Sequence, residues 1–170
     1  GQSKRFLEQL CRYYQRTTNL QCGIVRPSGA VGRFDNFDER TSHVLPGMIA
    51  RAMALKPGDP FVIWGTGEDV RDLIHSSDVA YGLLLAVAHA PNSDPINIAS
   101  GVGISTKHMA RLVLDAIDSD AEIVCDPEKP SALRTRLVSI DKAKRVLGFE
   151  PRVSLNDGVK DIISWRKDHA

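Results

Sequence analysis

The spacing of hydrophobic and polar positions divides the chain into alternating helix-like and strand-like segments. Residues 3–16 carry apolar side chains at helical intervals, whereas residues 22–25 and 61–64 are short apolar runs of strand length. The apolar face of the first helix is expected to hold Phe6, Leu7, Leu10, Cys11 and Tyr14. Such an alternation is typical of the α/β class.

The same pattern gives a provisional map of the whole chain. We expect helices over residues 3–16, 43–54, 77–90, 105–117, 141–147 and 155–167. We expect strands over residues 22–25, 61–64, 71–75, 95–99 and 121–125, a break over 26–29, and polar loops over 33–41 and 127–136. Helix ends are predicted from Ser77, Asp78, Ser105 and Ser154 as caps and from Gly148 as a terminator.

Composition narrows the class of protein. The 170 residues suffice for one domain, and a net charge of +1 shows no basic or acidic excess, which argues against nucleic-acid or membrane partners. The three cysteines lack the spacing of a metal site or a disulfide framework, so we expect reduced thiols and no metal. Residues 82–88 form the longest apolar run and are too few to cross a bilayer. With no visible signal peptide, we expect a cytoplasmic protein.

Three segments carry residues with chemical potential. Arg26 and Pro27 follow a strand, and the carboxyl ends of strands are where open α/β sheets bind ligands. His43 ends a long polar loop and opens a helix, where anions are favoured; a surface capping role is the alternative. Arg71 offers a planar fork of donors that matches a diphosphate, although a salt bridge to Asp69 or Asp72 would also account for it.

Residues 61–80 resemble the substrate-domain motif of the extended short-chain dehydrogenases/reductases, the NAD-dependent nucleotide-sugar epimerase/dehydratase family. That motif is a Trp-Gly-x-Gly turn followed by Arg-Asp/Glu-Phe/Leu-Ile-His, and here it reads from Trp64 to His75. Further likeness covers residues 1–4, 20–32, 95–103, 129–143 and 147–151. Residues 35–46 are similar to the Asp-Asn-Phe … Ser-His-Val-Ile-Pro segment of the GDP-fucose synthases within this family.

The resemblance implies roles for individual residues. It makes Lys4 the catalytic lysine of a Tyr-x-x-x-Lys pair, with the tyrosine one residue before Gly1, so the chain would be the C-terminal portion of an enzyme and inactive alone. It makes His43 a general acid for epimerisation. It also implies a cofactor, NAD or NADP, bound with the help of Lys4, Arg26 and Pro27 and mainly by a missing N-terminal Rossmann half. The nucleotide-sugar substrate would be held by Trp64, Arg71 and Lys129.

The resemblance also implies an architecture. Residues 1–32 would end a Rossmann domain, a doubly wound parallel sheet, and residues 33–170 would form mainly a smaller mixed α/β substrate-binding domain. The first helix would contribute its apolar face to a homodimer or to the missing half. Gly29 and Val31 replace the asparagine and tyrosine usual in the family.

Several functions remain open at this point. A 4-epimerase, a 4,6-dehydratase and an epimerase/reductase, all acting through a keto-sugar, share these residues. A non-catalytic family member that binds nucleotide sugars or a protein partner is a further alternative, as is an α/β domain with no nucleotide-sugar role.

Overall fold

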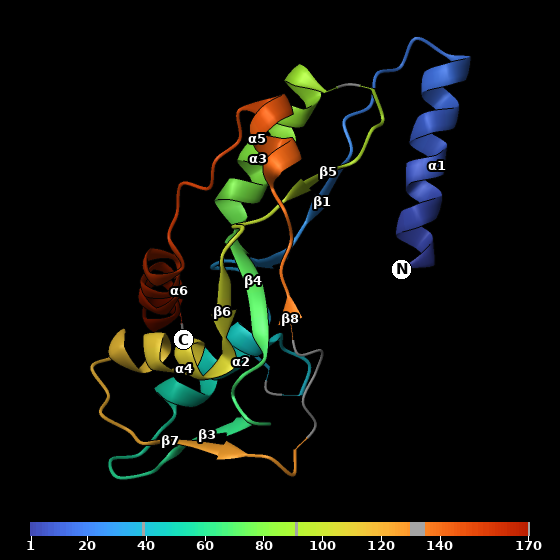
Figure 1. Cartoon of the computed structure of the whole chain (residues 1–170). Helices are drawn as coiled ribbons and strands as arrows, with labels where there is room; N and C mark the ends of the chain where they lie inside the picture. The colour runs from blue at the N-terminus through green and yellow to red at the C-terminus, as the bar shows by residue number, and fades with distance from the viewer. Residues whose placement is uncertain (39, 91, 130–134, 170) are drawn as a thin grey trace.

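The computed structural model describes residues 1–38, 40–90, 92–129 and 135–169 and has the predicted α/β character (Figure 1). The helices are α1 (Gln2–Thr17), α2 (Val44–Met53), α3 (Ser76–His89), α4 (Thr106–Asp115), α5 (Asp141–Leu147) and α6 (Leu155–His169). The strands are β1 (Val25–Pro27), β2 (Gly29–Val31), β3 (Phe61–Trp64), β4 (Val70–His75), β5 (Ile96–Ile98), β6 (Gly103–Ser105), β7 (Ile123–Asp126) and β8 (Thr135–Arg136).

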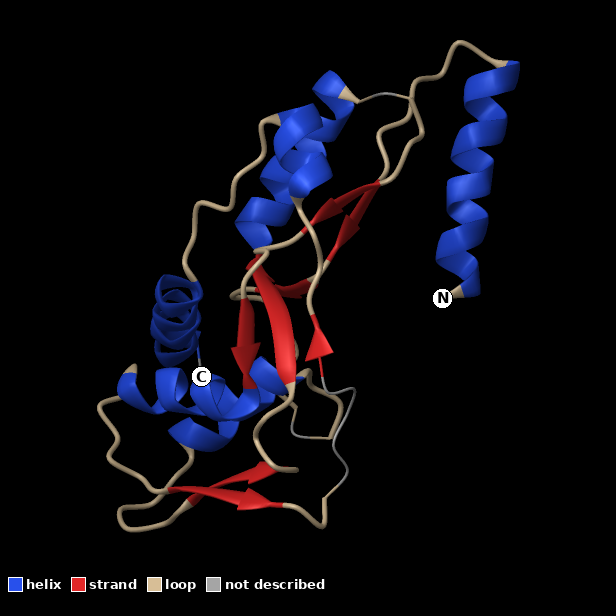
Figure 2. Ribbon diagram, viewed as in Figure 1, coloured by secondary structure: helices blue, strands red, loops and turns tan. Residues whose placement is uncertain are grey.

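Strand β4 is the centre of the arrangement. It pairs in parallel with β2 and β8 and antiparallel with β6. Two further pairs are parallel and separate from this sheet, β1 with β5 and β3 with β7. Figure 2 shows β4 as the long strand that runs between the β1–β5 pair and the β3–β7 pair.

Two hydrophobic cores lie at the two ends of β4. In one, helices α2, α4 and α6 cover β2 and β3, and its largest buried side chains include Phe61, Ile63 and Met109. In the other, α3 and α5 pack on β5 and the end of β4, around Phe149 and Ile98. Figure 1 shows the two groups of helices well separated. The molecule therefore has two lobes that share β4, which we call the β1–β5 lobe and the β3–β7 lobe.

Helix α1 stands beside the β1–β5 lobe and buries no residue (Figure 1). Its inward side makes polar contacts, in which Glu8 accepts two hydrogen bonds from Arg26 (2.8 and 2.7 Å) and Gln15 accepts one from Ser93. Cys11, expected on the apolar face, is instead half-buried on this inward side, and burial together with the nearby Cys22 raises the pKa of its thiol. The other residues expected on that face divide: Phe6, Leu7 and Tyr14 are exposed to solvent, and Leu10 is half-buried.

The first strand differs from its prediction. Cys22 forms only an isolated bridge, and the strand begins at Val25 and continues through Arg26 and Pro27, where we expected a break. Proline is tolerated here because Pro27 is the last residue of β1 and the following hydrogen bond to β5 is made by the Ser28 amide, which donates to the Ile98 carbonyl (2.9 Å). Gly29, expected in a turn, starts β2.

The start of α3 also differs from its prediction. The helix begins at Ser76, and the N-cap is His75, whose Nδ1 accepts from the Ser77 amide (3.4 Å). The Asp78 carboxylate is buried and accepts from the backbone amides of Arg152 and Val153 (3.0 Å each). Asp78 therefore ties the segment between α5 and α6 to α3 rather than capping a helix.

Other expectations about element ends are mixed. Ser105 caps α4 through the His108 amide (3.2 Å), Ser154 accepts from the Asp157 amide, and Gly148 ends α5 with a φ of +61°, all as predicted. Strands β6 and β8 were not predicted, because each is too short to show an alternating pattern. In the part of the chain that the structure describes, no helix is both long and apolar enough to traverse a bilayer.

Candidate functional site

A pocket of about 360 Å³ lies beside the β3–β7 lobe and brings three of the sequence-predicted residues together. His43, Trp64 and Arg71 come from the start of α2, the end of β3 and the start of β4. The pocket is lined by Ser42, His43, Val44, Gly47, Met48, Arg51, Trp64, Asp69, Arg71 and Thr106. Residues far apart in the sequence thus converge on one cavity.

Arg71 is held in place on β4, with its side chain 16% exposed. Its Nη1 donates to the Val70 carbonyl (3.0 Å), and its Nη2 lies 3.9 Å from a carboxylate oxygen of Asp69. Asp72 is the other candidate partner from the sequence. It faces the opposite side of the strand, where its carboxylate accepts hydrogen bonds from the backbone amides of Ser100 and Gly101. Arg71 is therefore a cation that remains in the pocket wall beside one carboxylate.

His43 occupies the N-cap position of α2, but its side chain makes no capping hydrogen bond. The imidazole is 84% exposed, and its Nδ1 lies 3.7 Å from Asp35, whose side chain is 17% exposed. In the segment before it, Asn36 donates to Thr41 (2.8 Å) and accepts from the Asp38 amide (3.0 Å). The geometry gives His43 an acidic neighbour and access to the pocket.

Trp64 presents a largely exposed indole, 57% accessible, at the mouth of the pocket. The end of β3 is fixed by pairing of Trp64 with Asp126 and by a hydrogen bond from the Gly65 amide to the Asp126 carbonyl (2.8 Å). An open aromatic surface of this kind can stack on a flat ring or cover an apolar edge.

Lys129 does not line this pocket among the residues described. It lies in the turn after β7, where its amide donates to the Asp126 carbonyl (3.3 Å). Pro130, which the resemblance pairs with Lys129, lies outside the described residues. The prediction that Lys129 and Arg71 face each other across one cleft stays a prediction.

Sequence reasoning missed two arginines near Arg71. Arg51 lines the pocket from α2, donates to the Val62 carbonyl (2.6 Å) and lies over the Phe61 ring at 5.0 Å. The sequence signal for it is the eight-residue spacing from His43, since positions i and i+8 fall within one broad face of a helix. Arg136 on β8 is the register partner of Arg71, and only the parallel pairing reveals that.

Lys4, Arg26 and Pro27 lie away from this pocket, at the β1–β5 lobe. Lys4 is exposed in the first turn of α1. The Arg26 guanidinium is engaged by Glu8, and Pro27 ends β1. The predicted cofactor residues and the predicted substrate residues therefore fall on different lobes.

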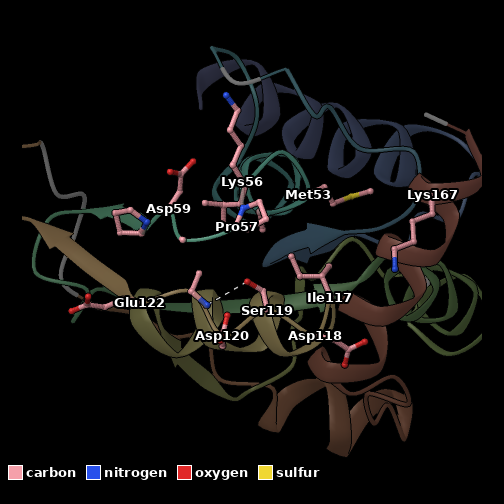
Figure 3. Close-up of a pocket in the computed structure, with 15 residues that line it drawn as sticks. Met53, Lys56, Pro57, Asp59, Ile117, Asp118, Ser119, Asp120, Glu122 and Lys167 are labelled. Carbon is pink, nitrogen blue, oxygen red and sulfur yellow. Dashed lines mark hydrogen bonds between the residues drawn. The ribbon is translucent and has the colours of Figure 1, made fainter.

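A larger hollow of about 770 Å³ lies at the far end of the β3–β7 lobe (Figure 3). Its wall is formed by the turn before β3 and the turn before β7, with Lys167 of α6 at one side. The acidic side chains Asp118, Asp120 and Glu122 lie along one side of the hollow, and Lys56 lies opposite them (Figure 3). None of the predicted site residues lines it, so we do not regard it as the candidate site.

Comparison with known proteins gives concordant matches. The model of the NAD dependent epimerase/dehydratase family matches residues 1–99. A relative named probable GDP-L-fucose synthase 1, from Oryza sativa subsp. japonica, is 28% identical over 159 residues, which is 92% of this chain and 48% of the relative. The chain thus spans about half the length of such relatives.

Two solved structures illustrate the likeness of fold. The UDP-glucose 4-epimerase of Thermotoga maritima, solved with UDP-glucose, matches with a TM-score of 0.80 and 27% identity over 95% of this chain and 51% of that one. The GDP-L-fucose synthetase of Naegleria fowleri, bound to NADP, matches with a TM-score of 0.88 and 24% identity over 97% of this chain and 54% of that one. The fold of the chain is accordingly that of half of such an enzyme.

Proposed function

Because the chain belongs to the NAD-dependent epimerase/dehydratase family, we propose that it is part of an enzyme that epimerises, dehydrates or reduces a nucleotide sugar through a keto-sugar, using NAD or NADP. The observation that carries the proposal is the convergence of His43, Trp64 and Arg71 on one pocket. The names of similar proteins supply support, since the rice relative is named a GDP-L-fucose synthase and the Thermotoga structure contains UDP-glucose.

The substrate diphosphate would be bound by the arginines of the pocket. Arg71 supplies a planar fork whose position is already fixed by the Val70 carbonyl, so little side-chain entropy is lost on binding. Arg51 adds a second cation from α2. Trp64 would contact the nucleotide, and Lys129 would approach the diphosphate from the turn after β7.

His43 would act as the general acid of an epimerisation. Imidazole is the side chain best suited to donate a proton near neutral pH, and the His43 Nδ1 lies 3.7 Å from the Asp35 carboxylate. The exposed position leaves the ring free to reach a bound sugar.

The residues at the β1–β5 lobe fit a nicotinamide cofactor only in part. The Arg26 guanidinium is paired with Glu8, so its contribution, like that of Pro27, would come from the backbone at the carboxyl end of β1, the edge where α/β sheets bind ligands. Lys4 is exposed. Its positive charge would lower the pKa of the catalytic tyrosine with which the family's Tyr-x-x-x-Lys pair combines it. The cofactor would supply the hydride acceptor and donor.

The lobes suggest how the chain divides between domains. We propose that residues 1–32 complete a Rossmann domain and that residues 33–170 form mainly the substrate domain, with α3, β5 and α5 returning to the β1–β5 lobe. The strand edge of β1 that β5 does not cover is a suitable place for further parallel strands, which the other half of the relatives' length would provide. The apolar face of α1 would then serve a homodimer.

The decisive experiment is substitution of Arg71 in the full-length protein. Arg71→Ala should weaken binding of the preferred nucleotide among GDP, UDP and dTDP by about 1.5–3 kcal/mol, the scale of a hydrogen bond to a charged group. Titration calorimetry measures the loss directly. Arg145→Ala, which removes an exposed arginine of α5 far from the pocket, should leave binding unchanged.

Equal binding by the Arg71→Ala and Arg145→Ala proteins would remove Arg71 from the site and with it the main support for the proposal. Nucleotide binding that depends on Arg71 but occurs without turnover would favour the non-catalytic binding module instead.

A second substitution separates the chemical steps. His43→Gln should slow solvent-deuterium exchange next to the keto group while hydride transfer from NADPH continues, because only the exchange needs a proton donor on the sugar. The measurement compares deuterium incorporation by mass spectrometry with loss of NADPH absorbance. Equal slowing of both steps would give His43 a binding or structural role.

A further inference from the structure

Asp72 is a charged side chain placed almost entirely inside the molecule, with 4% of its surface exposed. It follows Arg71 on β4, so the two side chains point to opposite faces of the strand. Arg71 faces the pocket, whereas Asp72 faces the junction of the two lobes. The role of Asp72 must therefore come from the groups at that junction.

Both oxygens of Asp72 accept hydrogen bonds. Oδ1 accepts from the Ser28 hydroxyl (3.1 Å), the Ser100 amide (3.0 Å) and the Ser100 hydroxyl (2.8 Å). Oδ2 accepts from the amides of Gly101 (3.1 Å) and Val138 (3.4 Å). A neutral amide side chain could not replace this carboxylate, because its NH₂ group would meet backbone N–H donors.

The partners of Asp72 lie where the chain passes between the lobes. Ser28 separates β1 from β2, and Ser100 and Gly101 form the turn between β5 and β6. Val138 lies on the path from β8 to α5. One carboxylate thus holds three separate crossings between the β1–β5 lobe and the sheet around β4.

These crossings lie between the proposed cofactor-binding residues and the proposed substrate-binding residues. Ser28 directly follows Pro27, at the proposed cofactor edge, and Asp72 directly follows Arg71, at the proposed diphosphate site. The hydrogen bond from Ser28 to Asp72 is a direct link between these two segments. A displacement at this link changes the separation of the two ligands without touching either one.

We propose that Asp72 is a positioning residue that sets the placement of the nucleotide sugar relative to the nicotinamide cofactor; the proposal rests on the function given above. Hydride transfer depends steeply on the distance between donor and acceptor, and a misplacement of about 1 Å can reduce a rate by roughly 100-fold. Asp72 acts through the crossings that it holds and contacts no ligand.

The first test measures the crossings themselves in the full-length protein. In Asp72→Asn the side chain keeps one carbonyl oxygen, so either the Ser100 amide or the Gly101 and Val138 amides lose their acceptor, and hydrogen exchange there should accelerate by at least about tenfold. Asp78→Ala is the control, since Asp78 is also buried and one of its oxygens accepts from the backbone amides of Arg152 and Val153, an acceptor that alanine removes. Its exchange should accelerate only at those two residues.

The second test separates positioning from binding. Asp72→Asn should lower kcat at least about tenfold, while the dissociation constants of NADPH and of the best-binding nucleotide among GDP, UDP and dTDP change less than about twofold. Asp78→Ala should leave kcat per correctly folded molecule unchanged. Ser100→Ala, which removes one hydroxyl and keeps the carboxylate, should lower kcat by a smaller factor and serves if Asp72→Asn fails to fold.

The outcomes distinguish the two proposals. Unchanged exchange at the three amides, unchanged kcat, or a parallel loss of both ligands would overturn the role of Asp72. If the wild-type protein binds neither NADH nor NADPH and none of the three nucleotides, the proposed function fails, and with it the positioning role that rests on it. In that case accelerated exchange would show only that Asp72 secures the lobe junction.

Discussion

Helices α1 and α4 show the same kind of amphipathic pattern but stand in opposite environments. In α4 the apolar face is fully covered, and Met109, Ala110, Val113 and Leu114 have no exposed surface. In α1 no residue is buried, and Phe6, Leu7, Tyr13 and Tyr14 are each 47–63% exposed. Hydrophobic spacing thus identifies which face of a helix is apolar, but it does not show which element or partner packs against that face.

The two helices are also attached differently. Helix α4 is held by core packing against α2 and α6, whereas α1 is held by polar contacts, chiefly Glu8 with Arg26 and Gln15 with Ser93. Apolar burial contributes far more free energy than exposed ion pairs do. Helix α1 is accordingly the less firmly attached of the two unless its apolar face meets a partner.

The largest effect is expected in α4. Leu114→Ala should reduce the free energy of unfolding by about 2–5 kcal/mol, because it removes a fully buried side chain and leaves a cavity. Denaturant unfolding of the full-length protein measures the loss, which should not depend on protein concentration. A loss below about 1 kcal/mol would mean that α4 is not the core helix described here.

The next effect concerns the open face of α1. Leu7→Glu should raise the dissociation constant of the proposed homodimer at least about tenfold, equivalent to roughly 1.4 kcal/mol, by placing a charge in an apolar interface. Sedimentation velocity over a range of concentrations reads out the change. His108→Glu, on the exposed side of α4, is the control and should leave assembly unaltered. Identical sedimentation of all three proteins would argue that α1 does not mediate self-association.

The smallest effect concerns the polar side of α1. The hydrogen bonds from Arg26 hold the pKa of Glu8 below its ordinary value of 4.5, so Arg26→Met should raise it toward that value. The pair stabilises the fold by about 0.5 kcal/mol. This contribution is fully present above pH 4.5 and is lost as the pH falls through the lower pKa of the folded state.

An NMR titration of the Glu8 carboxyl measures the shift. Arg16→Met provides the comparison, since Arg16 bonds to the Arg12 carbonyl rather than to Glu8. A Glu8 pKa that does not respond to loss of Arg26 would show that α1 is oriented by other contacts.

The sequence predicted most elements whose patterns are long or sharply ended. Helix α5 ends at Gly148 as expected. The backbone takes the left-handed conformation there, which glycine adopts without strain because it lacks a side chain. Strands β2, β6 and β8 escaped prediction, since their pairing with β4 is set by residues distant in the chain. Pro27 was predicted to be a break because the sequence does not show that it takes the last position of a paired strand.

The candidate site was likewise predicted only in part from the sequence. The motif around Arg71 identified a pocket residue, and His43 and Trp64 line the same cavity. The sequence could not tell whether Asp69 or Asp72 lies beside Arg71, because that depends on the face to which each side chain points. Arg136 became visible only through the register of β8 with β4.

The pairing of β1 with β5 has a consequence for how the chain folds. Val25 is opposite Ile96, and all of α2, β3, β4 and α3 lie between them in the sequence. Contacts between such distant residues form slowly, because a long loop must close before they are made. During synthesis, β1 therefore emerges well before β5, and the edge of β1 that pairs with β5 stays unpaired until β5 has been made. We therefore expect chaperone binding and early aggregation to involve this segment. Substitutions that stabilise its local turns should shorten the time for which it remains unpaired.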